Sequence, residues 1–283
     1  MRACAVAWHA SPRPLPRRVS RRVTTAKSKG GGASIASVKP ERVDRLLSRL
    51  GYCTRSDAKK FYKRVTVDGV PVAKHDVKVL PCLDGHVLVD GEPLDFPDGL
   101  VVVLHKPAGF VCSHDDREGD NVYSLLPERW RNRNPTLEAV GRLDKDTTGL
   151  LIFTDDGRLS HQLTSPKKVV WKSYEVVVDV GVPDHAAALF QSGELLLVGE
   201  KKPCAPAKLT VDPTDRKKAT LQLTEGKFHQ VKRMMRSVGC EVTALHRAKF
   251  GDLGLGETRE GGTFVLSTEN LAKIFSQSIP DDD

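Results

Sequence analysis

The sequence predicts an α+β protein in which a small mixed module is followed by a larger, mixed, largely antiparallel domain. Two Asp-Gly hairpin signals follow an amphipathic helical stretch within residues 41–94. Short apolar runs and two helical stretches then alternate over 100–275 without a regular βαβ repeat. The chain has 283 residues, of which 39% are hydrophobic, and this length allows two domains.

The smaller module, residues 41–94, begins with a predicted helix whose apolar positions recur at helical spacing: Val43, Leu46, Leu47 and Leu50. Gly51 ends this helix. Thr54 and Asp57 have the spacing of a capping box, which predicts a second helix over about 55–64. Tight hairpins are predicted where an Asp-Gly pair follows a β-branched run, at Asp68-Gly69 and Asp90-Gly91.

The larger domain is expected over 100–275, after a segment with the composition of a linker, residues 95–99. Apolar or alternating runs predict strands over 100–104, 152–153, 174–178 and 219–223. Helices are predicted over 185–191 and 230–238. The polar tail, residues 276–283, ends in three aspartates and is expected to be disordered.

The positive charge of the chain, +8 overall, lies in its first forty residues. Residues 1–40 contain nine Arg and Lys residues and no acidic residue, and prolines interrupt them. This composition predicts a disordered organelle transit peptide. Its prolines, serines and threonines favour the chloroplast, whereas its arginines are equally typical of import into the mitochondrion. The alternative is a basic arm that binds RNA.

Several classes of protein are excluded by what the sequence lacks. It has no apolar run of 18 residues, so no membrane-spanning helix is expected. Its six cysteines contain no CxxC pair, and neither an HExxH motif nor a P-loop is present. We therefore expect no metal site and no cofactor, and we interpret the cysteines as small buried apolar residues in a reducing compartment.

Basic side chains gather on the two predicted helices of the module. Arg42, Arg45 and Arg49 fall on one side of the first helix. The second helix adds five cations: Arg55, Lys59, Lys60, Lys63 and Arg64. Two basic helices on one face favour binding of RNA phosphates, and a solvated charged face is the alternative.

The module resembles the S4 RNA-binding domain. The matching residues are Arg42-Val-Asp44 at the start of the first helix, Thr54-Arg55 at the start of the second, and Val65-Thr-Val-Asp-Gly69. The resemblance implies that the module binds RNA through its helical cations, Arg42, Arg45, Arg55, Lys59, Lys60 and Lys63.

The most informative stretch of the larger domain is Gly141–Gly157, a loop of charged and small residues that runs into an apolar strand. Asp144 lies where a carboxylate can face a cleft, although acidic loop residues more often cap a helix or contact water. The sequence Arg142-Leu-Asp144, followed by Thr148-Gly-Leu150, resembles the active-site signature of the pseudouridine synthases. Further segments resemble motifs of these enzymes: 104–109, 111–113, 160–161, 164–166, 172–174, 225–234 and 245–247. With the S4-like module first, the chain is most similar to the ribosomal small subunit pseudouridine synthase A type.

This resemblance implies a cofactor-free isomerisation of uridine in small-subunit rRNA by a chain expected to be a monomer. Asp144 matches the catalytic aspartate, Lys232 the basic residue beside it, and Tyr174 the tyrosine that stacks on the target base. Arg142 is expected to fill the gap left by the extruded base. The expected phosphate contacts are His229, Arg233 and Arg247. Whether Asp144 attacks C1′ or C6 of the nucleotide, or removes a proton from the sugar, stays open.

Three alternatives remain at this stage. The target is a large-subunit rRNA, the chain is a non-catalytic S4-type assembly factor, or the domain is a hydrolase that uses two carboxylates. The hydrolase needs a second carboxylate about 5–9.5 Å away, and Asp146 is the candidate. The Gly-Lys-Phe-His-Gln-Val-Lys-Arg-Met form of 226–234 favours the small subunit.

The leader can be tested apart from the rest of the chain. Residues 1–40 fused to a fluorescent protein should carry the reporter into the chloroplast, because the segment is acid-free, basic and interrupted by proline. The same segment with its arginines changed to glutamine is the matched control and should stay in the cytosol. Cytosolic fluorescence of the unmodified fusion would contradict the interpretation.

Overall fold

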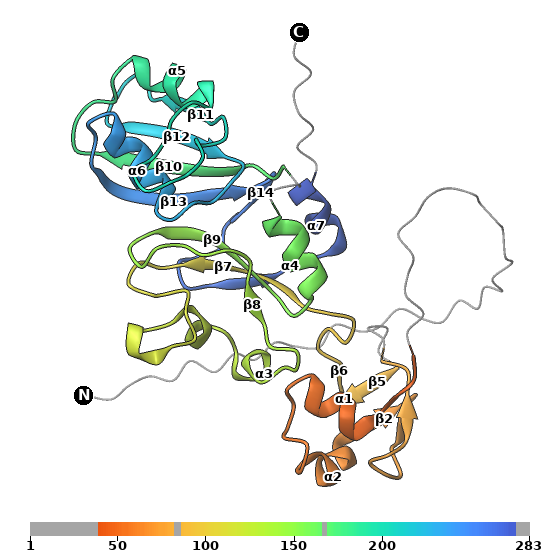
Figure 1. Ribbon diagram of the computed structural model, residues 1–283. Helices are drawn as coiled ribbons and strands as arrows, with labels where there is room; N and C mark the ends of the chain where they lie inside the picture. Colours follow the sequence, from red (N-terminus) through yellow and green to blue (C-terminus); the bar gives the residue numbers. More distant parts are fainter. Residues whose placement is uncertain (1–38, 82–85, 166–168, 276–283) are drawn as a thin grey trace, which may run out of the picture. The chain divides into compact units, whose positions relative to one another are not determined.

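A computed structural model describes residues 39–81, 86–165 and 169–275 (Figure 1). All of them belong to one compact unit, Val38–Asp283. The predicted transit peptide over 1–40, apart from its last two residues, and the predicted tail over 276–283 lie outside the described residues. Within the described ranges, no helix is both long enough and apolar enough to cross a membrane.

The described part of the module over 39–94 contains two short α-helices and one 3₁₀ helix beside small sheets. Its helices are α1 Val43–Arg49, α2 Ala58–Phe61 and the 3₁₀ helix η1 Tyr62–Arg64. Its strands are β1 Glu41–Arg42, β2 Val65–Val67, β3 Val70–Pro71, β4 Lys78–Val79, β5 Val87–Val89 and β6 Glu92–Pro93. Four of these strands form a sheet in the order β3-β2-β5-β6, and β1 pairs with β4. The predicted helix over 55–64 is therefore present as one α-helical turn and one 3₁₀ turn.

Local sequence accounts for the module's turns. Asp68 and Asp90 have positive φ angles of 50° and 53°, and the glycine after each also has a positive φ. Two consecutive residues of positive φ are what a tight hairpin turn requires, which confirms both predicted hairpins. Thr54 accepts a 3.2 Å hydrogen bond from the backbone N–H of Asp57 and donates its hydroxyl to the Asp57 carboxylate, but α2 begins only at Ala58, and its N-cap, Asp57, makes no side-chain capping bond.

The larger domain is built on one mixed sheet of nine strands in the order β11-β12-β10-β13-β9-β7-β15, with β14 and β8 paired to β13 and β9 (Figure 1). The strands are β7 Val101–Lys106, β8 Glu138–Ala139, β9 Thr148–Thr154, β10 Lys172–Val178, β11 Lys208–Val211, β12 Lys218–Leu223, β13 Val242–Phe250, β14 Leu253–Gly254 and β15 Thr263–Val265. Among the described strands of this sheet, β9 and β13 are the one pair that runs in parallel, over two residue pairs. The expected mixed, largely antiparallel α+β domain is confirmed.

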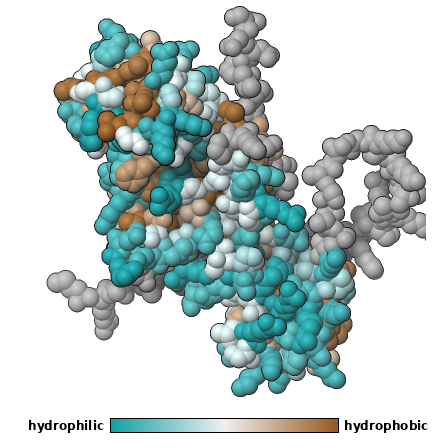
Figure 2. Space-filling model, viewed as in Figure 1, coloured by the Kyte–Doolittle hydropathy of each residue, from teal (hydrophilic) through white to brown (hydrophobic). Residues whose placement is uncertain are grey.

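Helices cover both faces of this sheet. They are α3 Glu128–Arg131, α4 Gly157–Thr164, α5 His185–Ser192, α6 Gln230–Ser237 and α7 Thr268–Phe275, with the 3₁₀ turns η2 Asp116–Glu118 and η3 Val122–Leu125. In the main core, Phe190 of α5 and Met234 of α6 pack with the side chains of β10 and β12. A second core includes Leu163 of α4 and Ile274 of α7. On the face of the molecule drawn in Figure 2, hydrophobic residues gather over the half of the domain that carries α5 and α6.

Strand β9 is buried on both sides, which explains the unbroken apolar run in its sequence. Leu151 and Phe153 belong to the main core, whereas Leu150 and Ile152 belong to the second core. At its first residues β9 meets β13, where Gly149 lies opposite Arg247. Gly149 has a φ of 110°, and a Cβ on it would lie 2.4 Å from the carbonyl oxygen of Arg247. Glycine is therefore required for the two strands to approach each other here.

The segment that joins module and domain is held by a buried ion pair. Arg133 donates to the Asp155 carboxylate at 2.9 Å and to the carbonyl oxygens of Asp95 and Phe96 at 2.8 and 2.9 Å. Asp155 also accepts a 2.8 Å bond from the backbone N–H of Leu100, where the domain begins. The segment over 95–99 is thus bonded directly to the domain, although its composition is that of a loose linker.

The close approach at Gly149 gives a stability prediction. Gly149→Ala should lower the free energy of unfolding by at least about 2 kcal/mol, because backbone strain of about 1–3 kcal/mol adds to the clash with Arg247. Gly157→Ala is the control, since a Cβ on Gly157 meets nothing within 4 Å and the residue begins α4. Urea unfolding of both variants is the measurement. Equal stabilities would mean that β9 and β13 tolerate a wider separation.

Candidate active site

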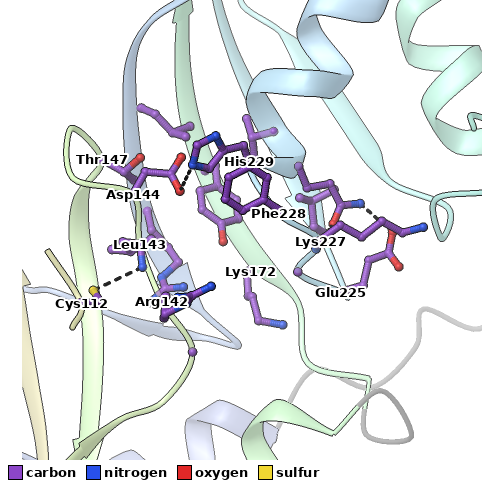
Figure 3. A pocket seen from close by; sticks show the side chains of 18 of the residues that line it. Cys112, Arg142, Leu143, Asp144, Thr147, Lys172, Glu225, Lys227, Phe228 and His229 are labelled. Carbon is purple, nitrogen blue, oxygen red and sulfur yellow. Dashed lines mark hydrogen bonds and ion pairs between the residues drawn. The ribbon is translucent and has the colours of Figure 1, made fainter. Parts of the chain in front are cut away.

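Strands β9 and β13 pair at the middle of the sheet, and we call this line of contact the seam between its two halves. A cavity of about 580 Å³ opens at the seam, and Figure 3 shows its lining. Its walls come from the loop over 140–147, from β10, from the segment over 223–232 and from β13. The three residues expected to carry the chemistry, Asp144, Tyr174 and Lys232, all line it. Segments far apart in the sequence therefore bring the predicted residues together.

The loop that carries Asp144 is fixed from below by Lys106 at the end of β7. This side chain has no solvent exposure. Its ammonium group donates to the carbonyl oxygens of Pro107, Lys145 and Thr147 at 3.0, 3.1 and 2.8 Å. Burial lowers the pKa of Lys106, although nearby acidic groups oppose this effect. Two of the three carbonyls lie just after Asp144, so Lys106 determines the path of the loop there.

Asp144 lies between two basic groups, with its side chain 24% exposed. The Lys232 ammonium is 3.1 Å from one carboxylate oxygen, and Nε2 of His229 is 3.4 Å from the other. Two basic side chains, one from α6 and one just before it, therefore contact the same carboxylate. A carboxylate held in this way has the charge and the exposure that a nucleophile or a general base requires.

Lys232 serves a second carboxylate as well. Its ammonium donates to both oxygens of Asp146, at 2.6 and 2.8 Å. Burial alone would lower the pKa of Lys232, but its bonds to Asp146 and Asp144 outweigh burial and raise this pKa. Burial likewise favours a raised pKa at Asp146, and the bond from Lys232 reverses this, so the pKa of Asp146 is lowered.

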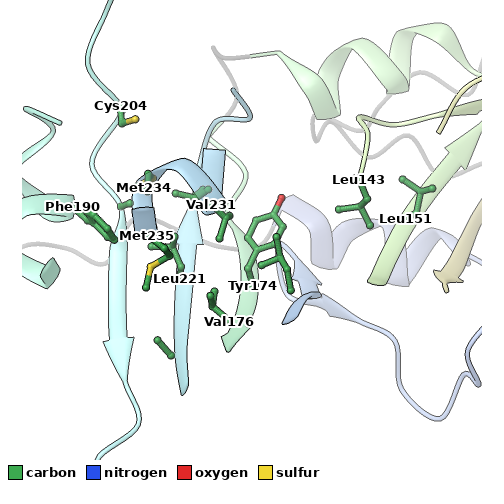
Figure 4. Close-up of a cluster of buried hydrophobic side chains, with 14 of the residues drawn as sticks. Leu143, Leu151, Tyr174, Val176, Phe190, Cys204, Leu221, Val231, Met234 and Met235 are labelled. Atoms are coloured by element: carbon green, nitrogen blue, oxygen red, sulfur yellow. The ribbon is translucent and has the colours of Figure 1, made fainter. Parts of the chain in front are cut away.

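Tyr174 forms one wall of the cavity and is 8% exposed. Figure 4 shows its ring between Val231 on one side and Leu143 on the other, at the edge of the main core. Leu223 and Leu245 line the same cavity and are also buried in that core. The ring is therefore held rigidly by its neighbours, and it lines the space that an aromatic base would fill.

His229 and Phe228 form an aromatic pair at the rim. The two rings stack with centroids 3.8 Å apart at an interplanar angle of 18°. Phe228 is 67% exposed. His229 precedes α6 with φ 46° and ψ 38°, a left-handed conformation that is uncommon for a residue with a side chain. Such strain is concentrated at functional sites, and here it directs the imidazole toward Asp144.

Two of the three predicted phosphate contacts lie elsewhere than expected. Arg247 is only 2% exposed, and its Nε donates to the carbonyl oxygen of Leu150 at 2.7 Å, so this side chain lies in the cavity wall and not on the outer surface. Arg233 donates to the Glu200 carboxylate at 2.9 Å and to the carbonyl oxygens of Val198 and Phe228. Its guanidinium therefore stabilises the segment before α6. Arg142 is exposed at the cavity mouth.

Lys172 lines the cavity and was not singled out from the sequence as a site residue. In Figure 3 it lies between Arg142 and Glu225. Burial, and next the positive charge of Arg247, lower the pKa of Lys172 to about 8. The only sequence signal was its place two residues before Tyr174 on the same strand, which puts both side chains on one face. In the described parts of the chain, no group of three or more His, Cys, Asp or Glu residues could hold a metal ion.

Residues 100–237 match the family model described as RNA pseudouridylate synthase. The ribosomal small subunit pseudouridine synthase A of Escherichia coli strain K12 is 41% identical over 216 residues, which cover 75% of this chain and 89% of that protein. Its counterpart from Pasteurella multocida is 37% identical over 235 residues, with 82% and 98% covered.

A solved structure is also similar to this chain. The crystal structure of a pseudouridylate synthase superposes with a TM-score of 0.57 at 34% sequence identity, covering 82% of this chain and 99% of the other. The chain belongs to the RNA pseudouridylate synthase family, which confirms the resemblance found in its motifs.

The buried ammonium of Lys172 gives a pH prediction. Its folded pKa of about 8 lies below the ordinary 10.5, so the unfolded chain binds more protons between these values and the free energy of unfolding rises with pH there. The slope from this group is at most about 1.4 kcal/mol per pH unit. In Lys172→Met this contribution should be absent. Urea unfolding between pH 8 and 10.5 is the measurement, with the exposed Lys218→Met as control, and an unchanged slope in Lys172→Met would contradict the burial argument.

Proposed function

We propose that this chain isomerises one uridine of an organellar small-subunit rRNA to pseudouridine, with Asp144 as the nucleophile. The observation that supports this most directly is the Asp144 carboxylate, which lies beside Lys232 and His229 in a cavity that Tyr174 also lines. The names of the E. coli and P. multocida relatives support the small subunit as the source of the RNA.

The reaction exchanges one bond for another within the nucleotide. The bond between N1 and C1′ breaks, the uracil rotates, and a bond forms between C5 and C1′. The hydrogen on C5 leaves as a proton and N1 gains one, so no oxidant or reductant is required. Asp144 can form and release a covalent adduct. Lys232 stays beside it as the counter-charge.

Extrusion of the target base costs a few kcal/mol, which contacts of the protein must offset. Tyr174 offers a rigid ring for the extruded base, and stacking of this kind contributes about 1–3 kcal/mol per base. The exposed ring of Phe228 offers a second surface for a neighbouring base at the rim. Arg142 makes no ion pair or hydrogen bond within the described chain, so it is free to enter the gap in the RNA.

The module over 41–94 is proposed to bind the RNA backbone, as the S4 resemblance implies. Its two basic helices differ in how many of their cations are already paired with carboxylates of the module. On α1, Arg42 is paired with Asp44, and Arg45 and Arg49 are paired with Glu41. The cations around α2 and η1 that are exposed and make no ion pair among the described residues are Arg55, Lys59, Lys60 and Lys63. The face of α2 and η1 is therefore the stronger candidate for phosphate contacts.

The composition of residues 1–40 supports import into an organelle, and its prolines and hydroxyl residues favour the chloroplast. Organelles have their own ribosomes of bacterial type, which fits the bacterial relatives. Mapping of pseudouridines in organellar rRNA from a strain without this protein would identify the modified position. Loss of a pseudouridine from large-subunit rRNA instead would replace the small-subunit proposal.

The assignment of Asp144 is tested by Asp144→Asn. The amide is nearly isosteric, so folding and RNA binding should be unchanged, but it is not an anionic nucleophile or base. Release of tritium from C5 of rRNA uridines should therefore fall to background. Asp184→Asn, an exposed carboxylate outside the cavity, is the control and should keep full activity.

Asp146→Asn is informative in a different way, because Asp146 shares Lys232 with Asp144. We expect it to lower activity without abolishing it, since Asp144 keeps its own contact with the ammonium. An essential Asp146 and a dispensable Asp144 would mean that the motif is assigned to the wrong carboxylate. Full activity in both variants would mean that neither carboxylate is the nucleophile, whereas a wild-type protein that bound rRNA but released no tritium would favour the non-catalytic assembly factor.

The contribution of α2 and η1 is tested with salt. Changing Lys59, Lys60 and Lys63 to glutamine should weaken binding to an rRNA fragment and flatten the dependence of log K on log salt. Each lost phosphate contact lowers the slope by about 0.7–0.9. The double change of Arg42 and Arg45 to glutamine is the comparison, and its effect should be smaller because both arginines are already paired. Equal effects would mean that the two helices contact RNA alike.

A further inference from the structure

The wall of the cavity formed by β10 and β13 contains two cations that the reaction described above does not use. Arg247 is 2% exposed and lines the cavity. Its Nε is bonded to the carbonyl oxygen of Leu150, but its Nη2 is buried and has no hydrogen-bond partner anywhere in the described chain. A buried donor without a partner costs about 1–3 kcal/mol, so its retention in a cavity wall calls for a ligand.

Lys172 is the second cation. Its ammonium reaches only the carbonyl oxygens of Val170 and Thr224, at the long distances of 3.3 and 3.4 Å. Within the described ranges neither Lys172 nor Arg247 has a carboxylate within 4.0 Å. The acidic neighbour of Lys172, Glu225, already accepts bonds from the Ala205 N–H and the Gln230 amide. The two cations are thus near each other, half or fully buried, and without a counter-ion.

Strand register puts this pair next to the base-stacking wall. Tyr174 on β10 lies opposite Arg247 on β13, and Lys172 lies opposite Phe250 two residues further along. All four residues line the cavity. A flat base that packs on the Tyr174 ring therefore turns one edge toward Arg247 and Lys172. Both groups only donate hydrogen bonds, so they accept an edge that carries an acceptor.

Uracil suits such a site in both orientations that the reaction requires. Rotation by 180° about the line through N3 and C6 exchanges N1 with C5, and it also exchanges the carbonyl at C2 with the carbonyl at C4. A donor-only site that holds one carbonyl before the rotation holds the other afterwards. Cytosine has an amino group at C4, so in one of the two orientations it would present a donor to two donors.

We propose that Arg247 and Lys172 form a recognition site for a carbonyl oxygen of the extruded uracil, which holds the base before and after its rotation and disfavours cytosine. This inference rests on the proposed function, because it takes an extruded uridine as the ligand. Both residues are specificity-determining groups that contact the substrate base.

The test measures single-turnover tritium release from the rRNA fragment that carries the modified uridine. Arg247→Gln and Lys172→Gln should each slow the wild-type reaction by about 10- to 100-fold, the value of a hydrogen bond from a charged donor. Replacing the target uridine with 4-thiouridine, whose sulfur is a poor acceptor, should slow the wild-type enzyme but have little further effect on either variant. Lys218→Gln, an exposed lysine on β12 outside the cavity, should behave as the wild type does.

A second RNA, with a methylphosphonate in place of the phosphate beside the target, separates base recognition from phosphate recognition. Its effect should be the same in wild type and variants. If the variants were insensitive to this change and still sensitive to 4-thiouridine, the pair would bind phosphate and the proposal would be overturned. If 4-thiouridine slowed the variants by the same factor as the wild type, the substitutions and the change in the base would act independently. The pair would then have a structural role, and the proposal would be overturned as well.

The two variants differ in their risk of misfolding. Arg247→Gln removes the bond to Leu150, whereas Lys172→Gln removes only long contacts and relieves a buried charge, so its unfolding midpoint should not fall. The coupling with 4-thiouridine in Lys172→Gln alone therefore decides the proposal. A wild-type enzyme that released no tritium from any rRNA would refute the proposed function, and this inference with it, whereas an active wild type with uncoupled variants would refute only the inference.

Discussion

The ammonium of Lys106 is the interaction on which the active site depends. It is fully buried, and it is bonded to three main-chain carbonyls, two of which follow Asp144 directly. An ionised group at this depth loses its hydration, and only the carbonyl oxygens replace it. Without Lys106 the carbonyl oxygens of Pro107 and Thr147 would lose this donor, and the Lys145 carbonyl would keep only its bond from the Gly109 N–H. The position of the Asp144 carboxylate thus follows from a charge at the end of β7.

The pairing of β9 with β13 brings the ordered Asp144 loop next to the other residues of the candidate site. The parallel contact at Gly149 and Arg247 joins the half of the sheet that carries Asp144 to the half that carries Tyr174 and α6. From α6, Lys232 reaches across the seam to Asp144. The cavity lies along this line of contact, so a single glycine that permits close strands also allows the two halves of the site to meet.

Predictions from the sequence succeeded where the cause is local. The Asp-Gly hairpins and the buried run of β9 depend on a few adjacent residues, and both are present. Strand β13 was missed although it is the longest, because Val242–Phe250 mixes charged and apolar residues and its pattern reflects neighbours on both sides. The burial of Arg247 was missed for a related reason: charge indicates the surface, and only the fold shows a cavity that accommodates it. The sharing of Lys232 by two carboxylates depends on tertiary distance, which spacing in the chain does not encode.

The double burial of β9 has a consequence for how this stretch of sequence is understood. Every residue from Gly149 to Thr154 is buried, so a substitution there affects the packing of the core and the stability of the fold before it affects catalysis. The glycine, the apolar run and the buried lysine beneath the loop would be required even in a descendant that no longer modified RNA. Most residues of the motif over 141–157 are therefore required for folding, and only the few side chains that face the cavity can indicate which reaction is catalysed.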